Sequence, residues 1–490
     1  MHAADTRADT GTGTGTGARP ERIVVIGGGI AGLAAAHRLL TRDTGPAPHV
    51  TVLEASDRVG GKLLAGEIEG ARVDLGAESM LARRPEAVGL AREVGLGDLL
   101  QPPATATASL WTRGALRPMP KGHVMGVPGD PSALSGVLSA EGLRRIEEDR
   151  ELPPTEIGED VAVGRYVADR LGREVVDRLV EPLLGGVYAG DAYRISMRAA
   201  VPQLFDAARA HPSLLDAVRE IQGRAAAHPP AGPVFQGIAG GVGTLPLAVA
   251  DAVRARGGEI LTGAPVTELR RTTDGSPEPG ARWRVVTPGR VLHADAVVVA
   301  VPAPAAARLL AADAPAAAAE LAAVEYASMA LITLAYRRRD APLPEGSGFL
   351  VPPVDGHTVK ASTFASRKWV WIAEENPDLH VVRTSVGRYG DERDLGRDDA
   401  ELVGLSRHDL RAATGLTAAP VATRVTRWHD GLPQYPVGHP ARVARVRAHV
   451  AALPGLAVCG ALYDGVGIPA CVASAYAAAD LVAPAGAPAG

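Results

Sequence analysis

The first sixty residues show two kinds of apolar pattern in close succession. Arg22–Ile26 is a short β-branched run that ends in glycine, which is typical of a buried strand. Ile30–Leu40 has apolar residues on every helical turn and predicts a helix, and His49–Ala55 predicts a second strand. Residues 21–55 are therefore expected to form one β-α-β unit.

The rest of the pattern predicts an α/β chain with insertions. Residues 85–225 mostly favour helices, with Pro- and Gly-rich interruptions around 102–131 and 153–154. Residues 326–390 alternate as in a sheet, and residues 396–415 favour another helix. Further predicted segments are a hairpin at Gly70–Met80, a loop, helix and strand start at Phe235–Ile260, strands at 265–269, 282–287 and 294–302, and a strand, glycine loop and helix at Gly455–Val482. The segments at the two ends and near 235–300 are expected to meet in one domain.

A glycine-rich turn joins the first predicted strand to the first predicted helix. Gly27-x-Gly29-x-x-Gly32, with Gly28 inside it, has the spacing of a dinucleotide-binding turn. The first glycine permits the turn, the second lets a pyrophosphate approach, and the third lets helix and strand pack closely. The phosphates would then lie at the helix N-terminus, where free N–H groups point at them. A plain glycine turn in a sheet protein is the alternative.

Two further features favour a long dinucleotide. Glu54 lies 22 residues after Gly32, where a carboxylate accepts hydrogen bonds from ribose hydroxyls, although a surface glutamate is the alternative. The pair Gly60-Gly61 follows in "EASDRVGGK", and a plain NAD domain does not need it. It allows a second close approach of backbone to cofactor, which suits FAD, and Arg58 or Lys62 would balance pyrophosphate charge. A turn with solvated charges is the alternative.

The C-terminal segment "GALYDGVGIPACVASAYAAA" repeats the arrangement of strand, glycine loop and helix. Its helix N-terminus is expected to stabilise negative charge on a bound flavin. A structural strand-to-helix turn is the alternative interpretation.

Composition excludes several classes of protein. The chain has 490 residues, enough for two or three domains, and its net charge of −4 argues against nucleic-acid binding. Cys459 and Cys471 give no disulfide framework and fit a reducing cytoplasm. The histidines show no metal-ligand spacing, so no metal is expected.

No membrane span or secretion signal is expected from the sequence. The apolar stretch Ala294–Val324 is interrupted by three prolines and by charged residues, which disfavours a lipid-facing helix. Residues 1–20 are of low complexity and are expected to be disordered.

Together these motifs resemble a known enzyme family. "IVVIGGGIAGLAAAHRL", "VLEASDRVGGKL", "VDLGAESML", "GIAGGVGTLP" and "DGVGIPACVASA" are similar to segments of the protoporphyrinogen and coproporphyrinogen oxidases, within the FAD-dependent amine-oxidase-like superfamily. The segment "GGVYAGD" is the more specific part, and the likeness covers residues 21–482. It is strongest to the coproporphyrinogen III oxidases of Gram-positive bacteria.

The resemblance implies an α/β fold in three parts. These are a discontinuous Rossmann-like FAD-binding domain at 21–89, 211–300 and 425–485, a helical inserted domain at 90–210, and a sheet-based substrate-binding domain at 301–424. The implied cofactor positions are Gly27, Gly28, Gly29, Gly32, Glu54, Gly60, Gly61, Lys62, Gly76, Val266, Gly467 and Ile468. Relatives hold adenine through the backbone at Val266 and often have Asp at Ala470, so no carboxylate role is assigned there.

For the substrate, the resemblance implies three positions. The Gly186 carbonyl would face the reacting macrocycle, with a tight helix-to-loop turn as the alternative, and the functional role is catalytic. Arg84 matches a basic position of bacterial relatives, and Glu78 lies in the flavin-side loop. Other cations that could pair substrate carboxylates are Arg83, Lys121, Arg367, Lys368 and Arg388.

The implied reaction is a six-electron oxidation of coproporphyrinogen III to coproporphyrin III in haem biosynthesis, with O2 as acceptor and H2O2 as product. Basic residues on three segments favour this tetracarboxylate over protoporphyrinogen IX, which remains the nearest alternative. An amine or carotenoid oxidoreductase, or a non-catalytic carrier of prenylated GTPases, is a more distant alternative. The family context also implies transient contact with ferrochelatase and at most peripheral contact with a membrane.

Overall fold

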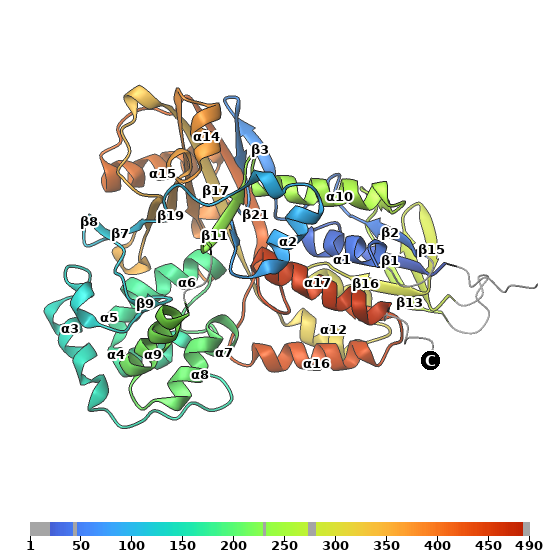
Figure 1. Cartoon of the computed structure of the whole chain (residues 1–490), viewed down its shortest axis with the longest axis horizontal. Helices are drawn as coiled ribbons and strands as arrows, with labels where there is room; N and C mark the ends of the chain where they lie inside the picture. The colour runs from blue at the N-terminus through green and yellow to red at the C-terminus, as the bar shows by residue number, and fades with distance from the viewer. Residues whose placement is uncertain (1–19, 43–46, 229–231, 273–280, 484–490) are drawn as a thin grey trace, which may run out of the picture.

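The computed structural model describes residues 20–42, 47–228, 232–272 and 281–483 (Figure 1). The tail expected to be disordered lies outside these ranges apart from Pro20. Helices of the middle of the chain gather at the lower left of Figure 1, a large sheet at the upper left, and a βα body built from both chain ends and the middle at the right.

A parallel sheet of five strands forms the centre of the βα body. The strand order is β12-β2-β1-β16-β22, and every neighbouring pair is parallel. The strands are β1 (Arg22–Ile26), β2 (His49–Leu53), β12 (Glu259–Leu261), β16 (Ala296–Val299) and β22 (Leu456–Val458). In chain order this is 3-2-1-4-5, the order of doubly wound nucleotide-binding folds.

Side chains of β1 supply both cores of this body. Ile23 and Val25 pack on one face, while Val24 and Ile26 pack on the other, as the two-residue period of a strand requires. The first face is covered by α1 (Ile30–Leu40), α10 (Leu245–Ala255) and α17 (Ile468–Val482). The second face is covered by α11 (Ala303–Leu310), α12 (Pro315–Ala322), α16 (His439–Ala451) and the antiparallel strands β13 (Glu268–Arg271), β14 (Trp283–Thr287) and β15 (Arg290–Ala294).

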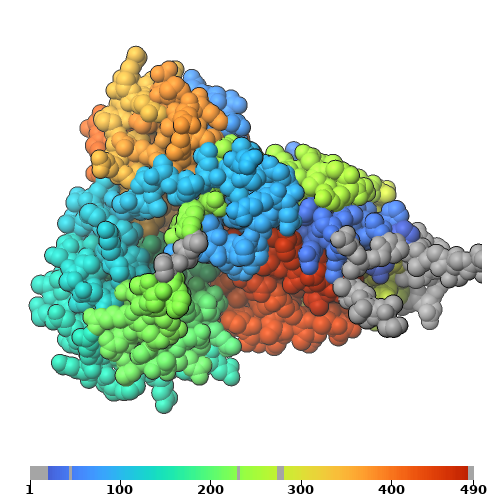
Figure 2. Space-filling model, viewed as in Figure 1, coloured from blue at the N-terminus to red at the C-terminus, as the bar shows by residue number. Residues whose placement is uncertain are grey.

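Segments from both chain ends lie side by side in this body. Helix α17 contacts both α1 and α2 (Pro85–Glu93). Figure 2 shows this on one face, where the blue N-terminal third lies directly against the red C-terminal segment. The expected meeting of the two ends with the segment near 235–300 is therefore observed in the sheet and its helices.

A second sheet has seven strands in the order β21-β17-β20-β19-β18-β7-β8. They are β7 (Ala108–Thr112), β8 (Ala115–Pro118), β17 (Tyr326–Arg337), β18 (Gly348–Leu350), β19 (Val359–Phe364), β20 (Leu379–Val386) and β21 (Ala422–Pro433). Only the β18–β7 pair is parallel among these. Helix α15 (Asp399–Thr414) packs on the sheet and begins with a capping box formed by Asp398 and Glu401.

Residues 100–128 fall largely within the Pro- and Gly-rich interruption expected in the mostly helical stretch 85–225, and they form short strands that the sequence did not predict. They are β6 (Leu100–Gln101), β7, β8, β9 (His123–Val124) and β10 (Val127–Pro128). Arg113 and Gly114 occupy the left-handed region, with φ of 53° and 72°, and make the two-residue turn that joins β7 to β8. This hairpin extends the seven-stranded sheet. The predicted helical domain at 90–210 can therefore include only the later part of that range.

Three other expected boundaries move. The hairpin predicted at Gly70–Met80 is formed instead by β3 (Ala65–Ile68) and β4 (Ala71–Asp74), because Glu69 and Gly70 take the positive φ values of the turn. Phe235–Ile238, expected as a loop, is strand β11, which pairs with β5 (Met80–Leu81) and β6. The strand expected at 265–269 begins only at Glu268, as β13.

The helical part has its own apolar core. Its helices are α3 (Ala140–Glu147), α4 (Val163–Leu171), α5 (Arg173–Val175), α6 (Glu181–Tyr188), α7 (Met197–Ala200), α8 (Pro202–Ala210) and α9 (Leu214–Ala227), with a π-helical turn at Val176–Val180. Among the described residues, no helix combines the length and apolarity needed to cross a membrane.

A buried ion pair fixes the helices of this part to one another. Arg170 of α4 is about 1% exposed, and its Nε donates to Asp149 Oδ1 at 2.6 Å. Its other nitrogens donate to the carbonyls of Pro153 and Pro212 at 2.7 Å. The second oxygen of Asp149 accepts from Ser213 Oγ at 2.6 Å, at the start of α9. Each charge is therefore satisfied by several hydrogen bonds. Removing either side chain would leave the other charge buried and unpaired.

Replacing Arg170 by Met should lower the free energy of unfolding by about 3–5 kcal/mol, because the buried Asp149 charge would lose its partner. Denaturant unfolding followed by circular dichroism measures this. Arg144→Met, at an exposed position of α3, is the matched control and should change stability by less than about 0.5 kcal/mol. Equal unfolding midpoints for the two variants would contradict the assigned role.

Candidate functional site

The first glycine turn holds α1 unusually close to β1. Gly27 has φ of +113°, and a Cβ there would lie 2.5 Å from the Ala300 carbonyl oxygen. A Cβ on Gly32 would lie 1.9 Å from the Gly27 carbonyl oxygen. Both contacts are with backbone, which has little freedom to move. The predicted roles of these two glycines, turn and close packing, are thus visible in the geometry.

Gly29 differs from its neighbours because the space in front of it is open. No described atom lies within 4 Å of the position its Cβ would take, and its φ of −71° suits any residue. Gly29 is also the N-cap of α1, and no side chain caps this helix. The first N–H groups of α1 are therefore available to an anion in that open space.

Glu54 lies beside this turn, at the carboxyl end of β2. Its Oε2 accepts from the Gly28 N–H at 2.7 Å, and its Oε1 accepts from the N–H and hydroxyl of Ser56, each at 2.8 Å. A Cβ on Gly28 would meet the Glu54 Cβ at 2.8 Å, so glycine is needed for this approach. A carboxylate has lone pairs for further donors, which fits a bound diol.

The second glycine pair makes backbone contact with the first turn. The Gly60 N–H donates to the Gly28 carbonyl at 2.8 Å, and Gly29 and Gly60 form an isolated parallel bridge. Gly60 and Gly61 have φ of +105° and +57°, where glycine is favoured. The two glycine segments are separate in the sequence, but their backbones contact each other in the structure. No glycine side chain stands between them, so together they form one backbone surface.

The third glycine motif opens a second helix at the same edge of the sheet. Gly467 is the N-cap of α17, again without a side-chain cap, and Ile468 is its first residue. Since α1 follows β1 and α17 follows β22 in a parallel sheet, both helices present their N-termini at the carboxyl ends of the strands. The N-termini of both helices would favour negative charge at this edge of the sheet.

Lys62 lies between the second glycine pair and α17. Burial lowers the pKa of its amine, and the nearby Cys471 and Asp430 counter this only in part. The amine lies 5.8 Å from the centre of the Tyr326 ring. Removal from water makes this cation a strong partner for any anion that enters the site.

Neither of the two buried cysteines near this site offers a reactive thiolate to which a cofactor could be attached. Cys459 and Cys471 are free and buried. Burial raises the pKa of Cys471 to about 12 and raises that of Cys459 strongly as well. Both therefore stay protonated at neutral pH.

The flavin-side loop predicted from "VDLGAESML" is held by a buried ion cluster. Glu78 accepts from Lys368 Nζ at 2.5 Å and from an Arg383 nitrogen at 2.7 Å. Burial alone would raise the pKa of Glu78, but the two cations outweigh it and keep the pKa below its usual value. Arg383 also donates to the Gly76 carbonyl at 2.7 Å. A Cβ on Gly76 would lie 2.1 Å from the Lys62 carbonyl oxygen, so this loop too packs backbone against backbone.

Lys368 is one of several cations expected from the sequence to pair substrate carboxylates, whereas Arg383 was not singled out. In the structure, Lys368 is paired with Glu78, and Arg383 is about 8% exposed in the middle of β20. A single arginine within the apolar strand "HVVRTSV" was the available signal, because a buried strand tolerates a charge only when it is paired.

A second carboxylate that the sequence did not single out supports the "GIAGGVGTLP" segment. Asp74, at the end of β4, accepts from the N–H groups of Val242 and Gly243 at 2.9 and 2.8 Å. Burial raises its pKa to about 6 despite these bonds. Asp74 thereby ties the β3–β4 hairpin to the start of α10.

The predicted substrate positions lie apart from the glycine surface along the chain. Gly186 is exposed in the last turn of α6, where carbonyls have no intrahelical donor, and the nearest atom to a Cβ there would be Leu350 Cδ2 at 3.7 Å. Arg84 is the N-cap of α2, 41% exposed, and pairs with Glu86 at 3.2 Å. Arg367 donates to the Leu343 carbonyl at 2.7 Å, and Val266 is half-buried in the loop before β13.

Known proteins share this arrangement. The model of the family described as flavin containing amine oxidoreductase matches residues 30–483. A coproporphyrinogen III oxidase of Mycobacterium tuberculosis (strain ATCC 25618 / H37Rv) is 38% identical over 460 residues, which cover 93% of this chain and 96% of the relative. A coproporphyrinogen III oxidase of Bacillus subtilis (strain 168) is 32% identical over 468 residues, covering 94% and 97%.

Among solved structures, that of a candidate protoporphyrinogen oxidase from Exiguobacterium sp. 255-15 superposes with a TM-score of 0.81 at 32% identity, covering 94% of this chain and 98% of that chain. The likeness spans nearly all of each protein compared. A flavin is the cofactor that this family implies, and the open glycine surface with its two helix N-termini fits one. The chain belongs to the flavin-containing amine oxidoreductases, and its predicted resemblance to the porphyrinogen oxidases among them is confirmed.

Proposed function

We propose that this protein is an FAD-dependent oxidase that converts coproporphyrinogen III to coproporphyrin III in haem biosynthesis. It would remove six electrons in three steps, with O2 as acceptor and H2O2 as product. The observation on which this rests most is the continuous backbone surface formed by Gly29, Gly60 and Gly61 beside Glu54. The choice of coproporphyrinogen III as the substrate is supported by the names of the two relatives, both coproporphyrinogen III oxidases.

FAD is favoured over a shorter nucleotide because a second glycine pair lies against the first glycine turn and because the matching family is described as flavin containing. Gly27, Gly28, Gly29 and Gly32 would seat the pyrophosphate at α1, and Glu54 would accept from the ribose hydroxyls. Gly60, Gly61, Lys62 and Gly76 would line the route toward the flavin, with Gly467 and Ile468 at its ring and Val266 at the adenine. On this proposal the FAD-binding domain comprises 21–89, 211–300 and 425–485.

When bound, FAD supplies the acceptor for two electrons, which no side chain of the protein could supply. The chain itself has to bind the cofactor and the substrate, orient them toward each other and exclude water. The Glu78, Lys368 and Arg383 cluster holds the loop at Gly76 in place, because moving it would separate buried charges. The Gly186 carbonyl, free at the end of α6, would orient the macrocycle as a hydrogen-bond acceptor from its pyrrole N–H groups.

Residues 301–424 and the helical segment within 90–210 would enclose the substrate. Arg84 would pair a propionate at the edge, with Glu78 acting indirectly through the cations it holds. Two buried free thiols fit a cytoplasmic setting. A transient contact with ferrochelatase would pass on the product.

Oxidation of protoporphyrinogen IX is the second candidate, which the name of the Exiguobacterium protein favours. The decisive experiment supplies the FAD-loaded protein with each porphyrinogen in turn and follows porphyrin fluorescence, peroxide and O2 uptake. We expect a higher kcat/KM for coproporphyrinogen III and one peroxide for each two electrons removed. Equal or better turnover of protoporphyrinogen IX would refute the substrate assignment.

FAD should be released by acid precipitation, because both cysteines are buried and protonated and offer no nucleophile to the cofactor. Absorbance of the supernatant and mass spectrometry of the released compound test this. Colour that stays with the pellet, or a released compound other than FAD, would contradict the prediction.

Gly29→Val and Gly32→Val should fail in different ways. Gly29→Val should unfold within about 1 kcal/mol of the parent when both lack cofactor, since its side chain enters open space, yet it should retain little FAD. Gly32→Val should lower the free energy of unfolding by about 1–3 kcal/mol or more, because its Cβ would meet backbone at 1.9 Å. Flavin absorbance and denaturant unfolding separate the two effects; full FAD occupancy in Gly29→Val would reduce Gly29 to a turn residue.

Arg84→Ala should raise KM for coproporphyrinogen III by about two- to fivefold, with a smaller effect on protoporphyrinogen IX. The effect is modest because the side chain is 41% exposed and already pairs with Glu86. Steady-state kinetics with both substrates measures it. Unchanged kinetics on both would remove Arg84 from the substrate site.

A further inference from the structure

A β-bulge in the seven-stranded sheet separates Lys360 from the regular register of its strand. On β19, Val359 pairs with Val386 of β20, whereas Ala361 pairs with Ser385, the residue next to it. Lys360 is therefore the extra residue of the bulge. Bulges redirect a side chain away from the regular alternation and are frequent beside active sites.

The ammonium of Lys360 has no acceptor among the described residues. No hydrogen bond or ion pair joins it to another group there, although the Arg388 charge is near enough to lower its pKa. Burial is the larger cause, and together they lower the pKa of Lys360 to about 7. Lys360 is half-buried, so its amine is only partly removed from water, and beside another cation its charged form is unfavourable unless an anion compensates it.

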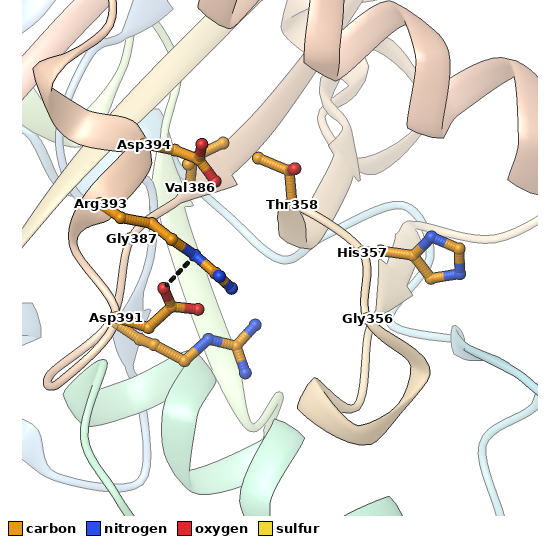
Figure 3. A pocket seen from close by; sticks show the side chains of 9 residues that line it. Gly356, His357, Thr358, Val386, Gly387, Asp391, Arg393 and Asp394 are labelled. Atoms are coloured by element: carbon orange, nitrogen blue, oxygen red, sulfur yellow. Dashed lines mark ion pairs between the residues drawn. The ribbon is translucent and has the colours of Figure 1, made fainter.

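Arg388 is a second cation without an ion-pair partner among the described residues, although two acidic residues lie near it. Its pKa is lowered by burial, and Glu181 and Asp391 only partly offset this. Asp391 is engaged by Arg393 at 2.9 Å, which Figure 3 shows as a dashed line across the pocket that Arg388 also lines. Glu181 accepts from the Ala192 N–H at 2.7 Å, and burial raises its pKa to about 7. Neither acid forms an ion pair with Arg388 among the described contacts.

The strand that carries Lys360 and the loop that carries Arg388 both contact α6, the helix of Gly186, or the residues just after it. Helix α6 contacts β18 and β19, and Leu350 of β18 approaches Gly186. The Tyr389 N–H, next to Arg388, donates to the Ala189 carbonyl just after α6 at 2.7 Å. Of the other charged groups near β19 and β20, Arg383 and Lys368 are paired with Glu78, and Asp409 of α15 accepts from the Val359 N–H at 2.9 Å.

We propose that Lys360 and Arg388 form a binding site for a carboxylate of the substrate, delivered against α6 near Gly186. This deepens the proposed function and rests on it, with one propionate of the porphyrinogen as the anion. The bulge presents Lys360, Arg388 follows the neighbouring strand, and the acids that would otherwise neutralise them are engaged elsewhere. A carboxylate with two oxygens satisfies both cations at once.

The test measures binding of coproporphyrin III, which is not consumed, to the FAD-loaded full chain by fluorescence titration. Lys360→Met removes the charge and keeps the aliphatic stem, Lys360→Arg keeps the charge, and Arg339→Met removes an 85% exposed cation as the matched control. We expect the dissociation constant to rise about 10- to 100-fold in Lys360→Met and less than about threefold in the other two. KM should follow the same order with little change in kcat.

The pH dependence separates charge from packing. In the parent, affinity should fall as pH rises above about 7, because the free amine loses the proton that the carboxylate needs. Lys360→Arg should lose this step, since a guanidinium stays charged. Lys360→Met should also unfold no earlier than the parent without ligand, because it removes an unpaired, half-buried charge that lies beside another cation.

The outcomes distinguish the two proposals. A parent protein that oxidises neither porphyrinogen refutes the proposed function. A parent that oxidises coproporphyrinogen III, combined with parental affinity in Lys360→Met, refutes the carboxylate site alone. Equal weakening in Lys360→Met and Lys360→Arg, or a pH step that persists in Lys360→Arg, shows a packing role and also refutes it.

Discussion

The approach of helix α1 to strand β1 is the constraint on which the rest of the site depends. With 1.9 Å between a Gly32 Cβ and the Gly27 carbonyl oxygen, no larger residue fits without moving the helix. The position of α1 fixes where its free N–H groups point, and it also sets the space that the second glycine pair occupies. The cofactor surface is thus a by-product of how closely one helix lies on one strand.

Around this surface the chain uses buried charge where an apolar contact would serve stability equally well. Glu78, in the loop between β4 and β5, is held by Arg383 of β20 and by Lys368, which follows β19 in the chain. Replacing one partner would leave a buried charge without compensation. Replacing one apolar contact would lower the stability by a smaller amount. The two ion pairs therefore fix the loop at Gly76 and Glu78 against β20.

The sequence predicted the local features of the site well because they arise within short segments. The turn at Gly27, the position of Glu54 and the bounds of α1 follow from spacing and period alone. The hairpin of β7 and β8 was missed because its partner strand β18 lies more than 200 residues away, so only tertiary pairing reveals it. Lys360 was missed for a similar reason: the bulge is a relation between two strands, and neither sequence shows it. The pairing of Lys368 with Glu78 joins segments far apart in the sequence, so spacing alone could not predict it.

The burial of the two thiols has a consequence for the durability of the protein. Hydrogen peroxide oxidises thiolates, whereas protonated thiols react slowly. Cys471 lies in the first turn of α17 and is 6% exposed, and Cys459 is fully enclosed. An oxidase that generates peroxide at this end of the sheet would thus have its two cysteines in the chemical form that resists sulfenic acid formation, so repeated turnover need not inactivate it through sulfur chemistry.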